Sequence, residues 1–157
     1  MKEIHAQALT AAAFAPFGDV LNCDGAPDRM INAGLCGRFH DRARVHVTGG
    51  RVGISMFRSR LRQLPYQLDM IERHPLGSQA FIPLSMDSFL VVVARNDLVP
   101  QAFLTAPGEG VNFHRGTWHG VLTPLSGPGL FAVIDRIGEG PNLEEHYYPT
   151  PYRIVAA

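Results

Sequence analysis

The chain has 157 residues, 46% of them hydrophobic, and its formal net charge is zero when the histidines are neutral. This length suits one compact domain, and the apolar fraction is too high for a disordered chain. The balanced charge argues against a broad surface for nucleic acid or for an anionic membrane, so we expect neither as a partner. We expect residues 1–157 to form a single domain.

The first twenty residues contain Glu3 and His5 and lack a long apolar stretch, so they do not read as a signal peptide. The longest apolar run, residues 89–94, is far too short to span a bilayer. Cys23 and Cys36 have no metal-binding spacing. We expect two reduced thiols in a cytoplasmic protein, although the sequence leaves a disulfide between them open.

One short helix is expected near the start of the chain. Thr10 can cap a turn through residues 11–14 before Pro16 ends it. The 16 glycines and 12 prolines are spread along the chain and divide the rest into short pieces, as in all-β proteins. We therefore expect one or two short helices in an otherwise β-stranded fold.

Strand-like runs follow in chain order. Residues 39–47 place apolar side chains at odd positions, and residues 51–59 place Val52, Ile54 and Met56 on one face. Residues 66–74 alternate in the same way, with only Ile71 off the pattern. The run 88–94 is continuously apolar, which predicts a strand buried on both faces. The remaining predicted strands are residues 101–106 and 130–136.

This succession of short strands, with turn residues between them, favours a barrel or a sandwich. No run supports a β-α-β unit. The fold class predicted from the residues alone is all-β.

The first cluster of reactive side chains has the pattern E-x-H-x4-Q, formed by Glu72, His74 and Gln79. Residues i and i+2 of a strand share a face, so the carboxylate and the imidazole point the same way. Together with the amide oxygen they could form half of a divalent-metal site. A polar substrate pocket, or a hydrogen-bonded polar patch at a barrel mouth, fits the same spacing.

The second cluster is HRGTWHG, residues 114–120, with His114 and His119 on either side of Gly116. The glycine permits a turn that lets a histidine on each arm face one pocket. A hydrogen-bonded structural role fits His114 nearly as well. Trp118 fits core or rim packing whichever function is right.

Both clusters resemble cupin motifs. Residues 110–119 are similar to the second cupin motif, G-x5-P-x-G-x2-H, with His119 in the place of the histidine and His114 in the place of the proline. E-x-H-x4-Q resembles the first motif, H-x-H-x3–4-E, with Glu72 and Gln79 as departures. The resemblance implies a cupin-like β-barrel, a double-stranded β-helix. Glu72, His74, Gln79 and His119 could still hold a divalent cation such as Ni, Mn or Zn, but more weakly than the usual three imidazoles and a carboxylate.

Longer strings resemble one family, the ureidoglycolate lyases, which are cupin-like enzymes of allantoin catabolism. The similarity extends from about residue 9 to about residue 145. It implies cleavage of ureidoglycolate into glyoxylate and urea by a homodimer, with no redox cofactor. The strings that carry it are INAGLCGRFHD (31–41), ERHPLGSQAFIPL (72–84), GVNFHRGTWH (110–119) and AVIDR (132–136).

That reaction needs a base for the hydroxyl proton, an acid for the departing urea nitrogen and a cradle for the carboxylate. Histidine suits the acid–base roles near neutral pH. We assign them to His119 and His74, with His114 as the alternate. If a metal is bound, His74 and His119 would be ligands, and the metal would polarise an oxygen as a Lewis acid.

For the carboxylate, the candidates are Arg58 and Arg115, because arginine can bind a carboxylate through two hydrogen bonds. A solvent-facing charge at Arg58, and a salt bridge from Arg115 to Asp135, fit the sequence about as well. Asn32 could bind the ureido group or serve turn geometry alone. Gln79 and Trp118 complete the predicted substrate-binding set.

Asp135 and Arg136 are expected to form a structural ion pair, with the orientation of a catalytic histidine as the alternative reading. Two other functions stay open. One is a metal-dependent cupin isomerase or dioxygenase acting on another small carboxylate, which metal content would reveal. The other is a non-catalytic sensor for a ureide or a 2-oxo acid, which would bind its ligand without turnover.

Overall fold

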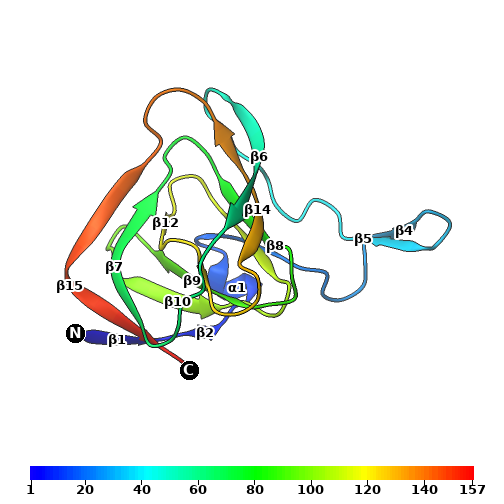
Figure 1. The fold of residues 1–157 in the computed structure, drawn as a ribbon. Coiled ribbons are helices and arrows are strands. Elements are labelled where there is room, and N and C mark those ends of the chain that lie inside the picture. The colour runs from blue at the N-terminus through cyan, green and yellow to red at the C-terminus, as the bar shows by residue number, and fades with distance from the viewer.

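The computed structural model describes all 157 residues, and its regular structure is almost entirely β-strand (Figure 1). The helix α1 (Ala11–Phe14) begins after Thr10, whose hydroxyl accepts a hydrogen bond from the Ala13 amide at 3.2 Å, as predicted. Phe14, the last residue of α1, is fully buried. No helix here is long and apolar enough to cross a membrane.

The larger sheet has eight strands and curls until it is nearly closed (Figure 1). In spatial order it contains β1 (Lys2–His5), β15 (Glu144–Val155), β7 (Tyr66–Arg73), β12 (Trp118–His119), β9 (Phe89–Ala94), β10 (Pro100–Leu104) and β2 (Gln7–Ala8), with β13 (Thr123–Pro124) also paired to β9. β1 and β2 are consecutive in the chain but lie at opposite ends of this order, so the N-terminal segment closes the ring.

A second sheet covers one side of the first. Its five strands, in spatial order, are β3 (Gly18–Leu21), β11 (Gly110–Phe113), β8 (Gln79–Pro83), β14 (Leu130–Ile137) and β6 (Arg51–Arg58). β6 is an edge strand, hydrogen-bonded only to β14. The predicted cupin-like, all-β barrel with one short helix is confirmed.

β9 lies between two apolar clusters, and all six of its residues are buried. Its odd-numbered side chains pack with Phe14, Phe103 and Val111, and its even-numbered ones pack with Leu68 and Ile154. The strand is therefore buried on both faces, as its continuous apolar run predicts.

The strand predicted over residues 39–47 is wrong, since only an isolated bridge from Val47 to Gly77 forms there. The stretch returns from an outlying hairpin and has no neighbouring strand to pair with. Ile71, which breaks the alternation of β7, is fully buried in the same cluster as Leu68. The partner strand β15 carries a register shift between Tyr147 and Tyr152, where the regular pleat is interrupted.

Val52, Ile54 and Met56 share one face of β6, as predicted, but that face is turned to solvent. Their exposed fractions are 47%, 76% and 66%. Across the strand pair, Ile54 lies opposite Ile134 of β14, and Ala132 next along β14 lies opposite Ile82 of β8. We call these outward side chains of β6, β14 and β8 the apolar face.

Between β3 and β6 the chain leaves the barrel and forms a hairpin of β4 (Arg29–Ile31) and β5 (Cys36–Arg38). Figure 1 shows this hairpin standing away from the body, on the side of β6, β14 and β8. We call residues 25–38 the arm. None of its residues is buried, and Leu35 at its tip is 89% exposed.

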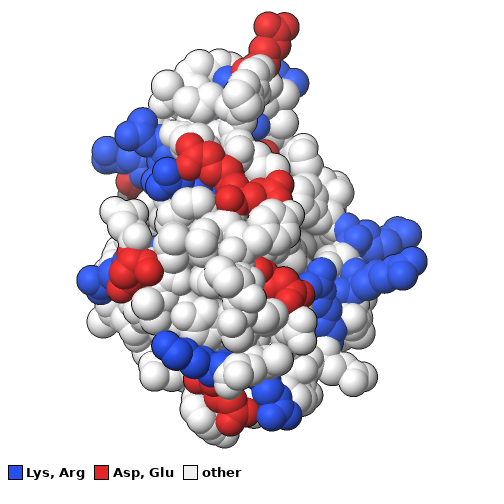
Figure 2. All heavy atoms as spheres, turned by 90° about the vertical axis from the view of Figure 1, so that its left-hand side faces the viewer, with Lys and Arg blue, Asp and Glu red and all other residues white.

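The opposite side of the molecule, which carries β15, is viewed in Figure 2. Lysine and arginine side chains alternate there with aspartate and glutamate side chains, and neither sign forms a continuous patch. One of the ion pairs, between Arg73 and Glu144 at 2.6 Å, joins neighbouring positions of β7 and β15.

Candidate active site

A cavity of about 490 Å³ opens at the mouth of the barrel, between the two sheets. It combines the two polar clusters of the sequence with a loop between β14 and β15. The lining residues are Phe57, Glu72, His74, Gln79, Phe81, His119, Val121, Leu122, Asn142 and Leu143. Each residue of the predicted metal set, Glu72, His74, Gln79 and His119, is therefore in the cavity wall.

Strand pairing explains why the polar side chains meet. His119 of β12 lies directly opposite Glu72 of β7, and His74 follows two residues later on the same face. The ligand atoms of Glu72, His74 and His119 all lie within 4.8 Å of one another. The two imidazole rings are 5.3 Å apart between centroids.

Both imidazoles are held in one orientation by the backbone. His74 Nδ1 lies 2.9 Å from the carbonyl oxygen of Asn142, and His119 Nδ1 lies 2.9 Å from that of Gly120. A carbonyl oxygen only accepts, so each Nδ1 donates and each Nε2 keeps a lone pair. Both Nε2 atoms are buried and have no hydrogen-bond partner. The two histidines thus present basic nitrogen atoms to the cavity.

Gln79 is oriented by the carboxylate of Asp135, which was predicted from the sequence to pair with Arg136. Its Nε2 donates to Asp135 Oδ2 at 3.0 Å, which leaves its Oε1 buried without a partner. The ion pair predicted between Asp135 and Arg136 is absent. Alternate residues of β14 point to opposite faces, and the Arg136 guanidinium instead donates to the carbonyl oxygens of Thr48, Gly49 and Glu139.

Burial shapes the ionisation of the site. Removal of the His119 imidazole from water is the main cause that lowers its pKa to about 4, with a smaller lowering by His74 and against the raising effect of the hydrogen bond to Gly120. Burial raises the pKa of the Glu72 carboxyl, which His74 partly offsets. His119 is therefore neutral at pH 7, and Glu72 keeps a proton more readily than a free carboxyl does.

The donor set fits a divalent cation. Two imidazole nitrogens and one carboxylate converge, and the Gln79 amide lines the same cavity. The two imidazole Nε2 atoms and the amide oxygen are buried with no partner within the protein. A histidine that binds a metal normally donates its other ring nitrogen to a carbonyl or carboxylate, as His74 and His119 do here. Such borderline nitrogen and oxygen ligands suit Ni, Mn or Zn.

Asn142 is a residue of the site that the sequence did not indicate. Its carbonyl oxygen accepts from His74, and its side-chain Oδ1 accepts from the Leu76 amide at 2.8 Å. It therefore fixes the segment on both sides of Pro75. The only indication in the sequence was the glycine- and proline-rich stretch after the last predicted strand, which marks a loop that contains Asn142.

The structure places His114 outside this cavity. Its Nε2 lies 3.3 Å from the Asp19 carboxylate, on the outer side of β3. Arg115 lines a different hollow, with Arg95 and His114. The turn still contacts the site through its backbone, because the Gly116 amide donates to the His74 carbonyl oxygen at 3.0 Å.

Three further predicted residues lie away from the cavity. Arg58 follows Phe57 on β6, and because Phe57 lines the cavity, Arg58 is on the outward side. Trp118 packs against the apolar cluster that contains Leu68 and Ile154, with the Arg73 guanidinium 4.6 Å above its ring. Asn32 is in the turn of the arm. The cavity wall thus contains no lysine or arginine.

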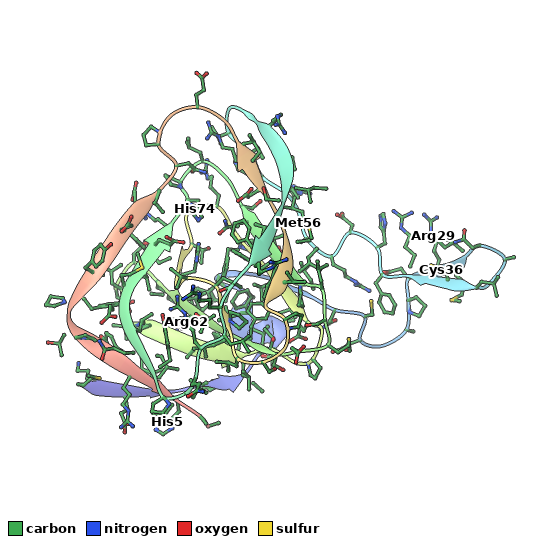
Figure 3. The ribbon with its side chains drawn as sticks, viewed as in Figure 1. His5, Arg29, Cys36, Met56, Arg62 and His74 are labelled. Atoms are coloured by element: carbon green, nitrogen blue, oxygen red, sulfur yellow. The ribbon has the colours of Figure 1, made fainter.

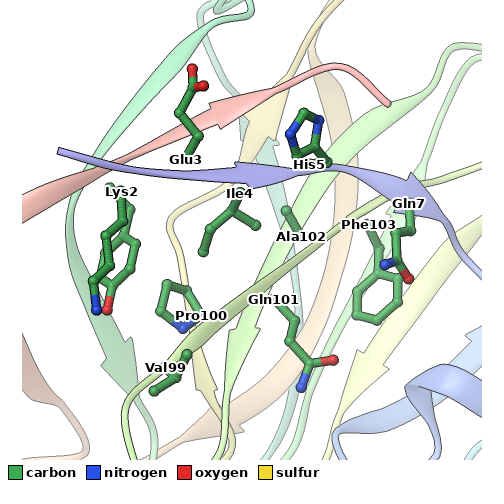
Figure 4. A pocket seen from close by; sticks show the side chains of 11 residues that line it. Lys2, Glu3, Ile4, His5, Gln7, Val99, Pro100, Gln101, Ala102 and Phe103 are labelled. Atoms are coloured by element: carbon green, nitrogen blue, oxygen red, sulfur yellow. The ribbon is translucent and has the colours of Figure 1, made fainter.

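A groove of about 460 Å³ between β1 and β10 is another hollow of similar size (Figure 4). Its lining includes Lys2, Glu3 and His5, which are largely exposed on the N-terminal strand. No buried polar atom without a partner faces it. Convergent polar groups mark the barrel mouth as the better candidate.

Replacement of Asp135 by asparagine is expected to lower kcat/KM, or the affinity for a divalent cation, by about 10- to 100-fold. The asparagine amide can donate to Gln79, which lets the glutamine amide turn over and present its NH2 group to the cavity. Steady-state kinetics and metal titration measure the effect. Asp69→Asn is the matched control, because Asp69 makes the same kind of bond to Gln67 at 2.7 Å on the surface. Equal effects of the two substitutions would contradict this role for Asp135.

Comparisons with known proteins agree with one another. The family model described as ureidoglycolate lyase matches residues 1–155. The ureidoglycolate lyase of Rhodobacter capsulatus is 57% identical over 156 residues, covering 96% of this chain and 97% of the relative. Those of Chelativorans sp. and Mesorhizobium japonicum are each 51% identical over 160 residues, covering 98% of this chain and 97% and 98% of the relatives.

Proposed function

The chain belongs to the ureidoglycolate lyase family of carbon–nitrogen lyases, and we propose that it cleaves ureidoglycolate into glyoxylate and urea in allantoin catabolism. The observation that carries the chemistry is the pair of buried, unpartnered Nε2 atoms of His74 and His119 beside the Glu72 carboxyl. The substrate carries a hydroxyl, a ureido group and a carboxylate on one carbon, so its cleavage requires one proton acceptor and one proton donor.

We assign the acceptor role to His74. Its Nε2 lone pair faces the cavity, and its imidazolium form would lie next to Glu72. When Nε2 takes the hydroxyl proton, the oxygen lone pair forms the C=O bond of glyoxylate and the C–N bond breaks. General-base catalysis of this kind contributes about 10²- to 10⁴-fold to a rate.

The departing nitrogen requires a proton to leave as neutral urea. Glu72 suits this role, because burial raises the pKa of its carboxyl. Donation leaves Glu72 as a carboxylate beside the His74 imidazolium. A proton transfer between these two neighbours then restores the starting state, so the cycle is balanced.

His119 stays neutral, because its pKa is held at about 4. We assign its Nε2 the role of accepting a hydrogen bond from the substrate, in place of the acid–base role predicted for it from the sequence. If a divalent cation is bound, we expect Glu72, His74, Gln79 and His119 to hold it. A bound cation would supply Lewis-acid polarisation of a substrate oxygen.

The direct test is incubation of purified protein with ureidoglycolate, with separate assays for glyoxylate, urea and ammonia. We expect equimolar glyoxylate and urea without ammonia. Release of ammonia would indicate hydrolysis of the ureido group instead. No turnover, either alone or with added Ni, Mn or Zn, would refute the proposal. Elemental analysis of untagged protein distinguishes a metal-dependent cupin from a metal-free lyase.

We also propose that the chain works as a homodimer in the cytoplasm and that residues 1–157 form a single catalytic domain. The apolar face supports association, because soluble monomers rarely expose contiguous apolar patches of this kind. Sedimentation of the purified protein tests the dimer directly.

A further inference from the structure

The cavity lacks a group that its proposed substrate requires. Ureidoglycolate carries a carboxylate, yet the lining contains Glu72 and no lysine or arginine. A substrate carboxylate placed in a partly buried site without a cationic partner is unfavourable. The arginines predicted for this task, Arg58 and Arg115, lie outside the wall. The side chains of one chain therefore supply no fixed positive charge for the substrate carboxylate.

The arm, in contrast, carries two positive charges that lie opposite each other. Arg29 of β4 lies directly across the ribbon from Arg38 of β5. Like charges in this arrangement destabilise a strand pair. Neither guanidinium forms an ion pair in the chain, whereas nearby Arg42 pairs with Asp28 at 3.1 Å. A carboxylate between the two guanidinium groups would relieve the repulsion.

The arm also lacks the packing that would hold it in place. Each strand of the ribbon has three residues, and an isolated two-stranded ribbon is at best marginally stable in water. Its turn is strained, since Ala33 has φ of 56° without being glycine. Met30 and Leu35 are both exposed apolar side chains on it. These features indicate a segment that packs against something outside its own barrel.

The chain itself offers the matching surface. The apolar face of β6, β14 and β8 lies on the side of the barrel from which the arm departs, and Figure 3 shows Met56 there, with Arg29 and Cys36 on the arm. One chain therefore carries both an arm that needs an apolar support and an apolar face that needs a cover. Two copies related by a two-fold axis satisfy both needs at once and leave neither exposed.

The apolar face also borders the cavity. β6 is the edge strand of its sheet, and its inward residue Phe57 lines the cavity, while Met56 beside it points outward. A segment packed on this face therefore lies beside the edge strand that separates the face from the cavity mouth.

We propose that the arm of each chain packs on the apolar face of a second copy, so that Arg29 and Arg38 reach the mouth of that copy's barrel and bind the substrate carboxylate. The role of the two arginines rests on the proposed function, whereas the position of the arm does not. The ligand that this cation pair recognises is a small carboxylate.

Complementation between two impaired variants, assayed at a ureidoglycolate concentration well below the wild-type KM, tests the arginines. Arg29→Met/Arg38→Met is expected to raise KM about 10- to 100-fold, from the loss of hydrogen bonds to a charged group. His74→Ala removes the base in the other variant. A heterodimer purified with two different tags contains one complete site if the arm acts across the interface, so about half of the wild-type activity should return. No recovery would mean that the arm acts on its own barrel or not at all, and would overturn the proposal.

Cross-linking tests the position of the arm without any turnover. In a Cys23→Ser background, Ile54→Cys places a thiol on the apolar face, within reach of native Cys36 on a partner's arm. A short bis-maleimide should give a covalent dimer, and Cys36→Ser in the same protein should abolish it. A monomer, or an unlinked dimer, would overturn the proposal. If the Ile54→Cys protein cross-links while the wild-type protein does not cleave ureidoglycolate, only the proposed function fails.

Discussion

Replacement of His74 by alanine is expected to lower kcat about 10²- to 10⁴-fold, the usual contribution of a general base. The substitution removes the Nε2 lone pair that faces the cavity. It leaves the backbone carbonyl of residue 74, which accepts from Gly116, in place. Steady-state kinetics with ureidoglycolate measure the loss. Added imidazole should restore part of kcat if the missing group is a base, and should restore none if the substitution merely disorders the loop.

Two further substitutions serve as a control and a comparison for this result. His5→Ala is the matched control, because His5 is exposed on β1 and lies far from the barrel mouth. It is expected to leave kcat unchanged. His114→Ala separates the two histidines of the HRGTWH turn. A loss in His114→Ala as large as that in His74→Ala would contradict the geometry of the cavity and favour the alternate assignment from the sequence.

The reactive centre was largely predictable from the sequence, because its residues are placed by local rules. Glu72 and His74 are two apart on a strand and must share a face. His119 joins them through strand pairing, as the resemblance to the two cupin motifs implied. These three side chains required no knowledge of distant contacts beyond the pairing of two strands.

The groups that orient the centre were harder to predict, because they act across long sequence separations. Asn142 holds His74 from 68 positions away, and Asp135 holds Gln79 from 56 positions away. Nothing in the local pattern distinguishes Asp135 from a surface charge. Its neighbour Arg136 suggested an ion pair, yet adjacent strand residues point to opposite faces and cannot readily pair.

The alternation of apolar and polar residues also did not show whether a strand forms or whether its apolar face is buried. Residues 39–47 alternate as a strand does, but no partner strand lies beside them. Residues 51–58 do form a strand, and their apolar face is exposed. The period of a sequence reports which side chains share a face. What covers that face depends on the rest of the fold, or on a second chain.

The metal-free protein is expected to lose stability in acid through His119. Its pKa is lowered by burial from 6.5 to about 4, so between these values the unfolded chain binds a proton that the folded chain does not. The free energy of unfolding is therefore independent of this group above pH 6.5. It falls by about 1.4 kcal/mol per pH unit below that, and is lower by about 3 kcal/mol at pH 4. Urea unfolding in the presence of a chelator, at several pH values, measures this slope.

A substitution that keeps the packing isolates the histidine from other titrating groups. His119 is stacked on Phe113 with ring centroids 4.3 Å apart and an interplanar angle of 6°, so His119→Phe can retain that contact without a titrating nitrogen. The difference in unfolding free energy between wild type and His119→Phe should widen as the pH falls from 6.5 to 4. Glu72 acts in the opposite sense, because its pKa is raised, but it is present in both proteins and largely cancels. His119→Asn, whose amide can still donate to the Gly120 carbonyl, serves if the phenylalanine variant packs poorly. A pH-independent difference would show that His119 is not held neutral by burial. The main reason for assigning the base to His74 rather than to His119 would then be lost.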